Sequence, residues 1–269
     1  MNVLYGLKDA AIAADLKLDV ARKVFGLDDE ACLKAAVDLL GKINDEFLPS
    51  DAIAFLARMA TEHSDPNRQL WRAEKEGEVA YFNGDILNCG INTVRGRAAE
   101  GIRDLLVADQ RYLNAFLPMI ERLVRDPNIS VRACVASTLL GVALHDEELA
   151  VSLFHVLVET DDVLLATHYA EDFIRRGLPK YLPQMCPHIE RMLRSEHAEA
   201  RQAGARLASL ARLYHEEADD LATTALSGDT ASRLGVAEIA KTNLTHSDCR
   251  EWCEQTLAVL FNDADATVL

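Results

Sequence analysis

Apolar residues recur at intervals of three and four along most of this 269-residue chain. In the segment 112–124, YLNAFLPMIERLV, the side chains of Leu113, Phe116, Ile120 and Val124 fall on one face of a helix. Strict alternation of apolar and polar residues, which indicates β-strands, is almost absent. Glycines and prolines lie mostly between the periodic segments. The pattern therefore predicts an all-α protein.

The same periodicity divides the chain into a series of helices. It predicts two N-terminal helices, four helix pairs and a closing helix, over residues 28–43, 48–63, 110–145, 147–176, 179–213, 215–244 and 247–261. Residues 64–91 interrupt this order and form its least regular part. We therefore expect a helical N-terminal cap with an irregular segment, a repeat region and a frayed tail, over residues 1–91, 92–261 and 262–269.

Similar short segments recur along the repeat region, which predicts a repeat architecture. Each begins near an arginine, at Arg95, Arg132, Arg201 and Arg233. The interval from Arg132 to Arg201 spans two periods of about 35 residues, and Ala166 occupies the intermediate position. An alanine follows four residues after each marker, at Ala99, Ala136, Ala170, Ala205 and Ala237. A small residue at a fixed place in every second helix predicts close helix packing.

A proline and a turn residue precede two of these arginines. Pro118 lies 14 residues before Arg132 with Asp126 between them, and Pro187 lies 14 residues before Arg201 with Ser195 between them. This combination resembles the HEAT repeat over about residues 92–244. The pairs at 147–176 and 215–244 depart from the family pattern because both lack the proline.

The resemblance implies a right-handed α-solenoid of HEAT-like helix pairs. It also implies that Arg132 is a structural residue, which reaches acidic groups or carbonyls of the neighbouring repeat from the edge of its helix. The apolar run after Arg132 would then be buried between adjacent repeats.

Charge and composition restrict the possible partners. Acidic residues outnumber basic ones by 43 to 28, and the net charge of −15 disfavours nucleic acid. A protein or peptide is the favoured partner, and the acidic charge favours a basic one. The N-terminus lacks the basic and apolar regions of a secretory signal, and no apolar stretch has the length of a membrane span. The scattered cysteines indicate reduced thiols, so we expect a cytoplasmic protein with no membrane contact.

Two groups of residues could carry chemistry. His246, Cys249 and Cys253 would share a helical face and could bind zinc, but no fourth ligand accompanies them, so we expect no metal. His168 lies close to Glu171 and Asp172 and could perform acid–base work, or the group could be a solvated face with helix-spaced ion pairs. No phosphate loop, dinucleotide motif or nucleophile elbow is present, so we also expect no cofactor.

Exposed residues of the second helices are the candidates for binding, because successive second helices line the inner curve of a HEAT stack. These candidates are Arg97, Arg103, His168, Glu171 and Asp172. Trp71, in the irregular segment, is a further candidate because long departures from a repeat period are often functional.

The favoured function is a non-enzymatic protein-binding scaffold or sensor. Residues 84–106 are also similar to stretches in the helical C-terminal arms of bacterial STAND-type NTPases, which implies a role as a sensor in bacterial defence. The alternative is a HEAT-like DNA glycosylase or another nucleic-acid-binding enzyme. That alternative predicts a basic groove containing Trp71 or Trp252, whereas the scaffold predicts an acidic one.

Overall fold

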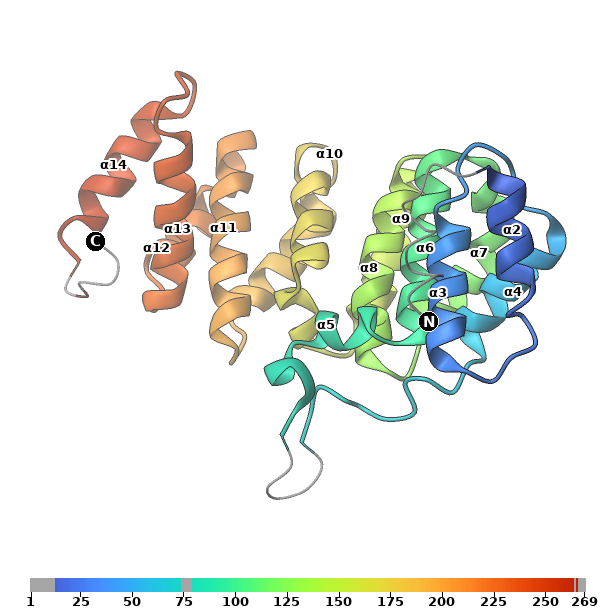
Figure 1. Ribbon diagram of the computed structural model, residues 1–269. Coiled ribbons are helices and arrows are strands. Elements are labelled where there is room, and N and C mark those ends of the chain that lie inside the picture. The colour runs from blue at the N-terminus through green and yellow to red at the C-terminus, as the bar shows by residue number, and fades with distance from the viewer. Residues whose placement is uncertain (1–12, 74–78, 264, 266–269) are drawn as a thin grey trace. The chain divides into compact units, whose positions relative to one another are not determined.

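The computed structural model describes residues 13–73, 79–263 and 265 of the chain. These residues form thirteen α-helices and three short 3-10 helices, and they contain no strand (Figure 1). The prediction of an all-α protein is confirmed. The chain divides into two compact units, Met1–Glu159 and Thr160–Leu269, which are described separately. Residues 1–12 of the expected cap and residues 264 and 266–269 of the expected tail lie outside the described residues.

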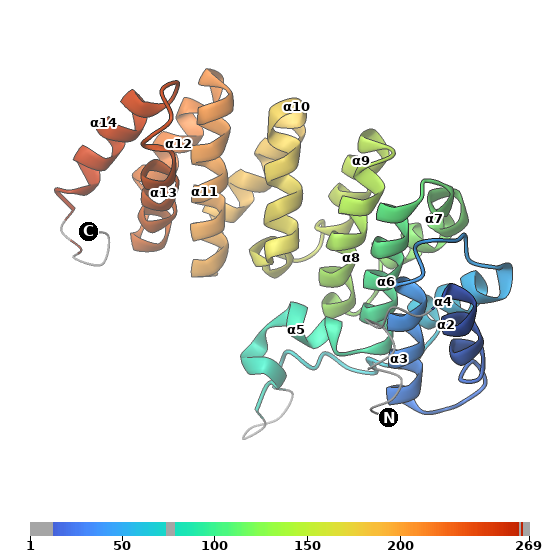
Figure 2. The same cartoon turned by 45° about the horizontal axis from the view of Figure 1, so that its top comes forward.

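Unit 1 packs its helices around α6 and α8 (Figure 2). α6 contacts α3, α4 and α8, and α8 contacts α5, α6 and α9. Neighbouring helices cover α8 on several sides, so almost all its residues are buried. A helix in such surroundings is apolar around nearly its whole circumference, as α8 is. The elements of this unit are α2 (Ala14–Arg22), α3 (Glu30–Gly41), α4 (Ser50–Thr61), η1 (Tyr81–Gly84), α5 (Ile86–Ile91), α6 (Val94–Ala108), α7 (Arg111–Leu123), α8 (Ile129–Ala143) and α9 (Glu147–Leu157).

Glycines allow the central helices of unit 1 to approach one another closely. A side chain at Gly90 in α5 would overlap the backbone oxygen of Ser130 and the sulfur of Cys134, both in α8. A side chain at Gly96 in α6 would in turn overlap the backbone oxygen of Gly90. The glycines of the GRAAEG segment, residues 96–101, therefore serve helix packing.

Unit 2 places α11 between α10 and α13 (Figure 1), and α14 packs on α13. Its elements are η2 (Asp162–Ala166), α10 (His168–Leu193), α11 (Ala198–Tyr214), η3 (Glu216–Ala218), α12 (Asp219–Leu226), α13 (Thr230–Asn243) and α14 (Arg250–Leu260). Ala166 ends η2, so it lies before α10 rather than inside a second helix as the repeat spacing suggested.

α10 contains two helical segments, as the sequence predicted, but they meet a few residues after the expected division at 176–179. It runs from His168 to Leu193, and Tyr181 is the residue with non-helical dihedral angles, φ −120° and ψ 32°. The Met185 side chain lies within 3.3 Å of the Cβ position at Gly177. Residues eight apart in a straight helix are about 12 Å apart, so the chain turns sharply at Tyr181 and joins two helical segments without a loop.

The repeating alanines are buried in most of the second helices. Ala99, Ala136, Ala170 and Ala205 are at most 2% exposed. Ala237 is partly exposed and lines a groove between α13 and α14. The small residue thus serves close packing at four of the five positions.

Leucine in place of Ala136 is expected to lower the free energy of unfolding by about 1–3 kcal/mol through overpacking. Ala136 lies in α8, which packs against both α6 and α9. Urea denaturation of the wild type and the variant measures the loss. Ala237→Leu is the matched control, because Ala237 has the same repeat position but a partly exposed site, and we expect a change within about 0.5 kcal/mol. Equal losses in the two variants would contradict burial of the alanine as the cause.

The marker arginines join neighbouring elements. Arg132 Nη1 donates a hydrogen bond to the Leu157 oxygen at 3.1 Å, which confirms that this arginine reaches a carbonyl of the following helix. The others form ion pairs with aspartates that follow them by 28 to 31 residues, Arg95 with Asp126, Arg201 with Asp229 and Arg233 with Asp263, at 2.5–2.7 Å. Each of these arginines therefore connects one helix pair to the next part of the chain.

Candidate functional site

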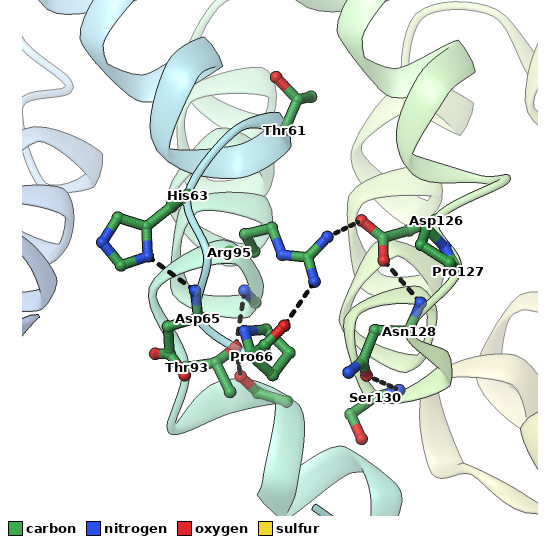
Figure 3. A network of polar contacts seen from close by, with 12 residues as sticks. Thr61, His63, Asp65, Pro66, Thr93, Arg95, Asp126, Pro127, Asn128 and Ser130 are labelled. Carbon is green, nitrogen blue, oxygen red and sulfur yellow. Dashed lines mark hydrogen bonds and ion pairs between the residues drawn. The ribbon is translucent and has the colours of Figure 1, made fainter. Parts of the chain in front are cut away.

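The irregular segment after α4 is bonded to neighbouring parts of unit 1 through its first residues, which we call its base (Figure 3). The Asp65 carboxylate accepts a hydrogen bond from Val94 N at 2.8 Å, and the Asp65 backbone oxygen accepts one from Arg95 N at 3.3 Å. Arg95 Nη2 donates to the Pro66 oxygen at 2.8 Å. The beginning of α6 thus holds residues 65 and 66 in place.

The next residues of the segment lie against the turn between α7 and α8. Asn128 Nδ2 donates to the Arg68 oxygen at 2.9 Å, and Gln69 Nε2 donates to the Pro127 oxygen at 3.0 Å. The indole N–H of Trp71 donates to Gln69 Oε1 at 3.0 Å. Trp71 is therefore connected through one side chain to the α7–α8 turn.

The returning part of the segment presents two aromatic rings to solvent. Tyr81 N donates to the Leu70 oxygen at 3.1 Å, which places Tyr81 beside residue 70. Phe82, Asn83 and Gly84 have positive φ angles of 51°, 55° and 86°. Asparagine and glycine commonly adopt such angles in turns, which accounts for residues 83 and 84. A phenylalanine in the left-handed region is unusual and costs conformational energy. This turn leaves Tyr81 51% and Phe82 49% exposed.

Arginines stack on these aromatic rings. The Arg72 guanidinium lies 4.0 Å from the centre of the Trp71 ring, and the Arg68 guanidinium lies 5.9 Å from the centre of the Tyr81 ring. Both distances allow cation–π attraction. We call Arg68, Trp71, Arg72, Tyr81 and Phe82 the aromatic–arginine surface. Aromatic residues and arginine are the types enriched in protein interfaces.

A pocket of about 240 Å³ adjoins the α7–α8 turn. We call it the arginine pocket. Its lining consists of Thr61, Arg95, Arg122, Leu123, Arg125, Asp126 and Pro127. Pro127 is also the residue whose oxygen accepts the hydrogen bond from Gln69. The Trp71–Gln69–Pro127 chain of hydrogen bonds therefore connects the aromatic–arginine surface to the pocket.

Asp126 is the acidic residue of this lining, and its carboxylate is already bonded on both oxygens. Arg95 Nη1 lies 2.7 Å from Oδ2, and Asn128 N donates to Oδ1 at 2.8 Å (Figure 3). Burial raises the pKa of Asp126, while the Asn128 N–H and the Arg95 charge oppose that rise. The Arg95–Asp126 pair is a buried structural contact in the wall of the pocket.

The binding candidates on α6 lie in ion pairs within unit 1. Arg97 Nη1 lies 2.5 Å from an Asp38 oxygen, which joins α6 to α3. Arg103 Nη2 lies 2.6 Å from its neighbour Asp104. Both arginines therefore have acidic partners in the chain itself.

The candidates in unit 2 share the first turns of α10 but have different surroundings. Glu171 forms two hydrogen bonds with Arg206 of α11, at 2.6 and 2.7 Å, and Arg206 also reaches Glu238 of α13 at 3.1 Å. Asp172 pairs with Arg175 at 2.7 Å. His168 is exposed and its ring lies 4.1 Å from that of Tyr169. Glu171 thus belongs to an ion-pair row across three helices.

The sequence offered Trp71 as a binding candidate, but no pattern in it indicated the pocket. Arg122 lies in the last turn of α7, and Arg125 follows three residues later in the turn after that helix. Arg95 comes from α6, about one period earlier in the chain. Local spacing does not reveal that these residues meet.

Of the possible zinc ligands near the C-terminus, the thiols of Cys249 and Cys253 lie close enough to interact. Cys253 is fully buried, and burial raises its pKa to about 11. The Cys249 thiol lies 3.6 Å from the Asn243 oxygen and 3.8 Å from the His246 backbone oxygen. Within the described ranges, no three His, Cys, Asp or Glu side chains are arranged to hold a metal ion.

Within the described part of the chain, no helix has the length and apolar character that crossing a membrane requires. Comparison with known proteins gives no match to any family model, to any curated protein or to any solved structure.

Proposed function

We propose that this chain is a non-enzymatic protein-binding scaffold or sensor, and that it binds a protein or peptide through the aromatic–arginine surface. The observation that carries this proposal is the exposure of Tyr81 and Phe82, beside arginine-stacked Trp71, on a segment whose base is fixed by hydrogen bonds. Rigid aromatic side chains of this kind supply contact area at low cost in conformational entropy.

The anchoring of the segment supports a binding role. Arg95, Gln69 and Asn128 contribute hydrogen bonds that hold residues 66–71 against the turn between α7 and α8. A partner would therefore meet a surface that is already ordered, and less ordering free energy would be lost on association. The left-handed Phe82 fits this interpretation, because conformational strain is concentrated at functional sites.

The repeat features add a proposed architecture to this proposed binding role. The regular arginine–aspartate contacts and the buried alanines support HEAT-like helix pairs arranged as a solenoid, in which each repeat can vary its exposed residues. The similarity of residues 84–106 to STAND-type sensor arms adds a sensor role in bacterial defence to the proposal. Those residues include α5 and the beginning of α6, which hold the base of the segment.

The charge of the partner follows from the local surface more than from the net charge of the chain. The net charge of −15 favours a basic partner. The carboxylates of the unit 2 candidates, however, are paired with arginines, and the aromatic–arginine surface presents cationic groups. A partner that binds at this surface therefore does not need to be basic.

A nucleic-acid-binding function is the second candidate, and the stacking of Arg72 on Trp71 favours it. Aromatic rings beside arginines are also the means by which proteins bind single-stranded nucleic acid. The same experiment can separate the two functions, because peptides and oligonucleotides can be offered to the same variants.

Selection of a displayed library of 12-residue peptides against the wild type tests the proposal. Peptides that are enriched should bind the Trp71→Ala/Tyr81→Ala variant at least about tenfold more weakly, a loss of about 1.4 kcal/mol. Trp252→Ala is the control, since it removes the other tryptophan and should leave binding unchanged. Thermal melting checks that each variant is folded.

Two outcomes would contradict a protein-binding role for this surface. One is the absence of any peptide whose binding depends on Trp71 and Tyr81. The other is that the wild type binds no peptide but binds an oligothymidine of 20 nucleotides, and that the double variant no longer binds the oligothymidine. That result would support the nucleic-acid function instead.

A further inference from the structure

The arginine pocket contains more positive than negative charge. Three of its lining residues are arginines and one is an aspartate, whose two oxygens are bonded to Arg95 and to Asn128 N. Arg125 donates to the backbone oxygen of Glu121, and neither Arg122 nor Arg125 forms an ion pair with any described residue. Arg122 and Arg125 therefore line this pocket and have no carboxylate partner from the described chain.

This lack of a partner contrasts with other arginines of unit 1. Arg22, Arg97 and Arg111 each pair with an aspartate at 2.5–2.8 Å. Carboxylates are abundant, since acidic residues outnumber basic ones by 43 to 28. Glu121 precedes Arg122 and is exposed, and so is Glu62 beside Thr61, but neither forms an ion pair at the pocket within the described residues. An acidic group from another molecule would supply the partner that the described chain does not.

The size and position of the pocket indicate what kind of acidic group it could receive. Its volume of about 240 Å³ is smaller than the 300–1,000 Å³ or so typical of drug-sized ligands. A single side chain is of suitable size, and guanidinium groups bind a carboxylate through paired hydrogen bonds. The pocket also adjoins Pro127, which is connected through Gln69 to Trp71. Gln69 thus joins one residue of the pocket lining to Trp71 of the aromatic–arginine surface.

We propose that the arginine pocket binds an aspartate or glutamate side chain of the peptide that contacts the aromatic–arginine surface, with Arg122 and Arg125 holding its carboxylate. This inference rests on the proposed function and adds the chemistry of the partner. Arg95 is a positioning residue here, because its guanidinium is already bonded to Asp126 and Pro66.

The test uses the full chain and the peptides enriched in the selection above. Each Asp or Glu of an enriched peptide is replaced by Asn or Gln, and binding to the wild type is measured by fluorescence anisotropy. We expect one such replacement to weaken binding about tenfold and to have little further effect in the Arg122→Ala/Arg125→Ala variant. Arg176→Ala is the matched control, because it removes an exposed arginine of unit 2 without an ion-pair partner among the described residues.

The outcomes separate this inference from the proposed function. If binding depends on Trp71 but on no acidic residue of the peptide, the carboxylate proposal is overturned and the proposed function stands. If no Trp71-dependent peptide is found, both are overturned. If the wild type binds oligothymidine and the Arg122→Ala/Arg125→Ala variant does not, the carboxylate proposal is overturned, and the pocket binds a phosphate group instead. Thermal melting of both variants establishes that they are folded, as expected because Arg122 and Arg125 are exposed.

Discussion

Alanine in place of Gly90 is expected to lower the free energy of unfolding by about 3 kcal/mol, the upper part of the range for overpacking. The added methyl group would overlap the Ser130 backbone oxygen and the Cys134 sulfur. The Ser130 oxygen cannot move away without displacing the first turn of α8. Alanine favours helices over glycine by about 1 kcal/mol, so propensity alone predicts the opposite sign. Urea denaturation measures the difference.

Gly26→Ala is the matched control for this substitution. A methyl group at position 26 would meet no atom within 4 Å, and Gly26 does not have a positive φ angle. We expect its stability to stay within about 0.5 kcal/mol of the wild type. A Gly90→Ala variant as stable as Gly26→Ala would contradict the close approach of α5 to α8.

Removal of the Arg95 side chain should cost about 3–4 kcal/mol, because it leaves the Asp126 carboxylate buried without its cationic partner. The side chains of Arg95 and Asp126 are 11% and 5% exposed. The same substitution removes the hydrogen bond to the Pro66 oxygen and so loosens the base of the irregular segment. Urea denaturation of Arg95→Ala gives the loss. The double variant Arg95→Ala/Asp126→Asn should recover part of it, since the uncompensated charge is gone.

The loss in Arg95→Ala should also depend on pH. Burial already raises the pKa of Asp126, and Arg95 opposes that rise, so its removal raises the pKa further. A carboxyl group with a raised pKa in the folded state binds protons more tightly there than in the unfolded state. The deficit of Arg95→Ala relative to the wild type should therefore be largest near neutral pH and shrink as the pH falls through the raised pKa.

Arg111→Ala provides the comparison for Arg95→Ala. Arg111 also pairs with an aspartate, Asp109, but these side chains are 66% and 28% exposed. Exposed pairs contribute up to about 1 kcal/mol. A loss in Arg95→Ala no greater than that in Arg111→Ala, or one independent of pH, would contradict the interpretation of Asp126 as a buried charge that needs Arg95.

Repeat spacing predicted the regular parts of the fold because it records packing that recurs. The markers at Arg132 and Arg201 located α8 and α11, and Arg132 reaches a carbonyl as expected. Two histidines show a related repeat. His145 and His215 lie two periods apart, and each ring contacts the backbone oxygen of an earlier second helix, at 2.6 and 2.9 Å.

Other elements were not predictable from local pattern. The helix α5 has six residues, too few to show a period, and the packing of Gly90 on α8 defines its place. The periodicity predicted that two helices part between residues 176 and 179, and in α10 two helical segments meet at Tyr181 without a loop.

The candidate site also differs from residue to residue in how well the sequence indicates it. Trp71 was identifiable because it is a rare residue in an irregular segment. The arginine pocket was not indicated by the sequence, because Arg95 belongs to α6, whereas Arg122 lies at the end of α7 and Arg125 in the turn that follows it. Their meeting depends on how those helices pack, and single-sequence periodicity carries no information about that contact.

The loop-free bend of α10 determines where unit 2 could accept a reporter domain or an affinity tag. Insertions are tolerated where the backbone is exposed and makes few hydrogen bonds. Leu178 and Leu182 flank the bend and are buried, so added residues there would pull core side chains out of unit 2. The turn after α12, at Ser227–Gly228, lies between separate helices, but Arg233 donates to the Gly228 oxygen. The segment between α13 and α14, residues 245–248, is exposed, which makes it the better position for a fused label.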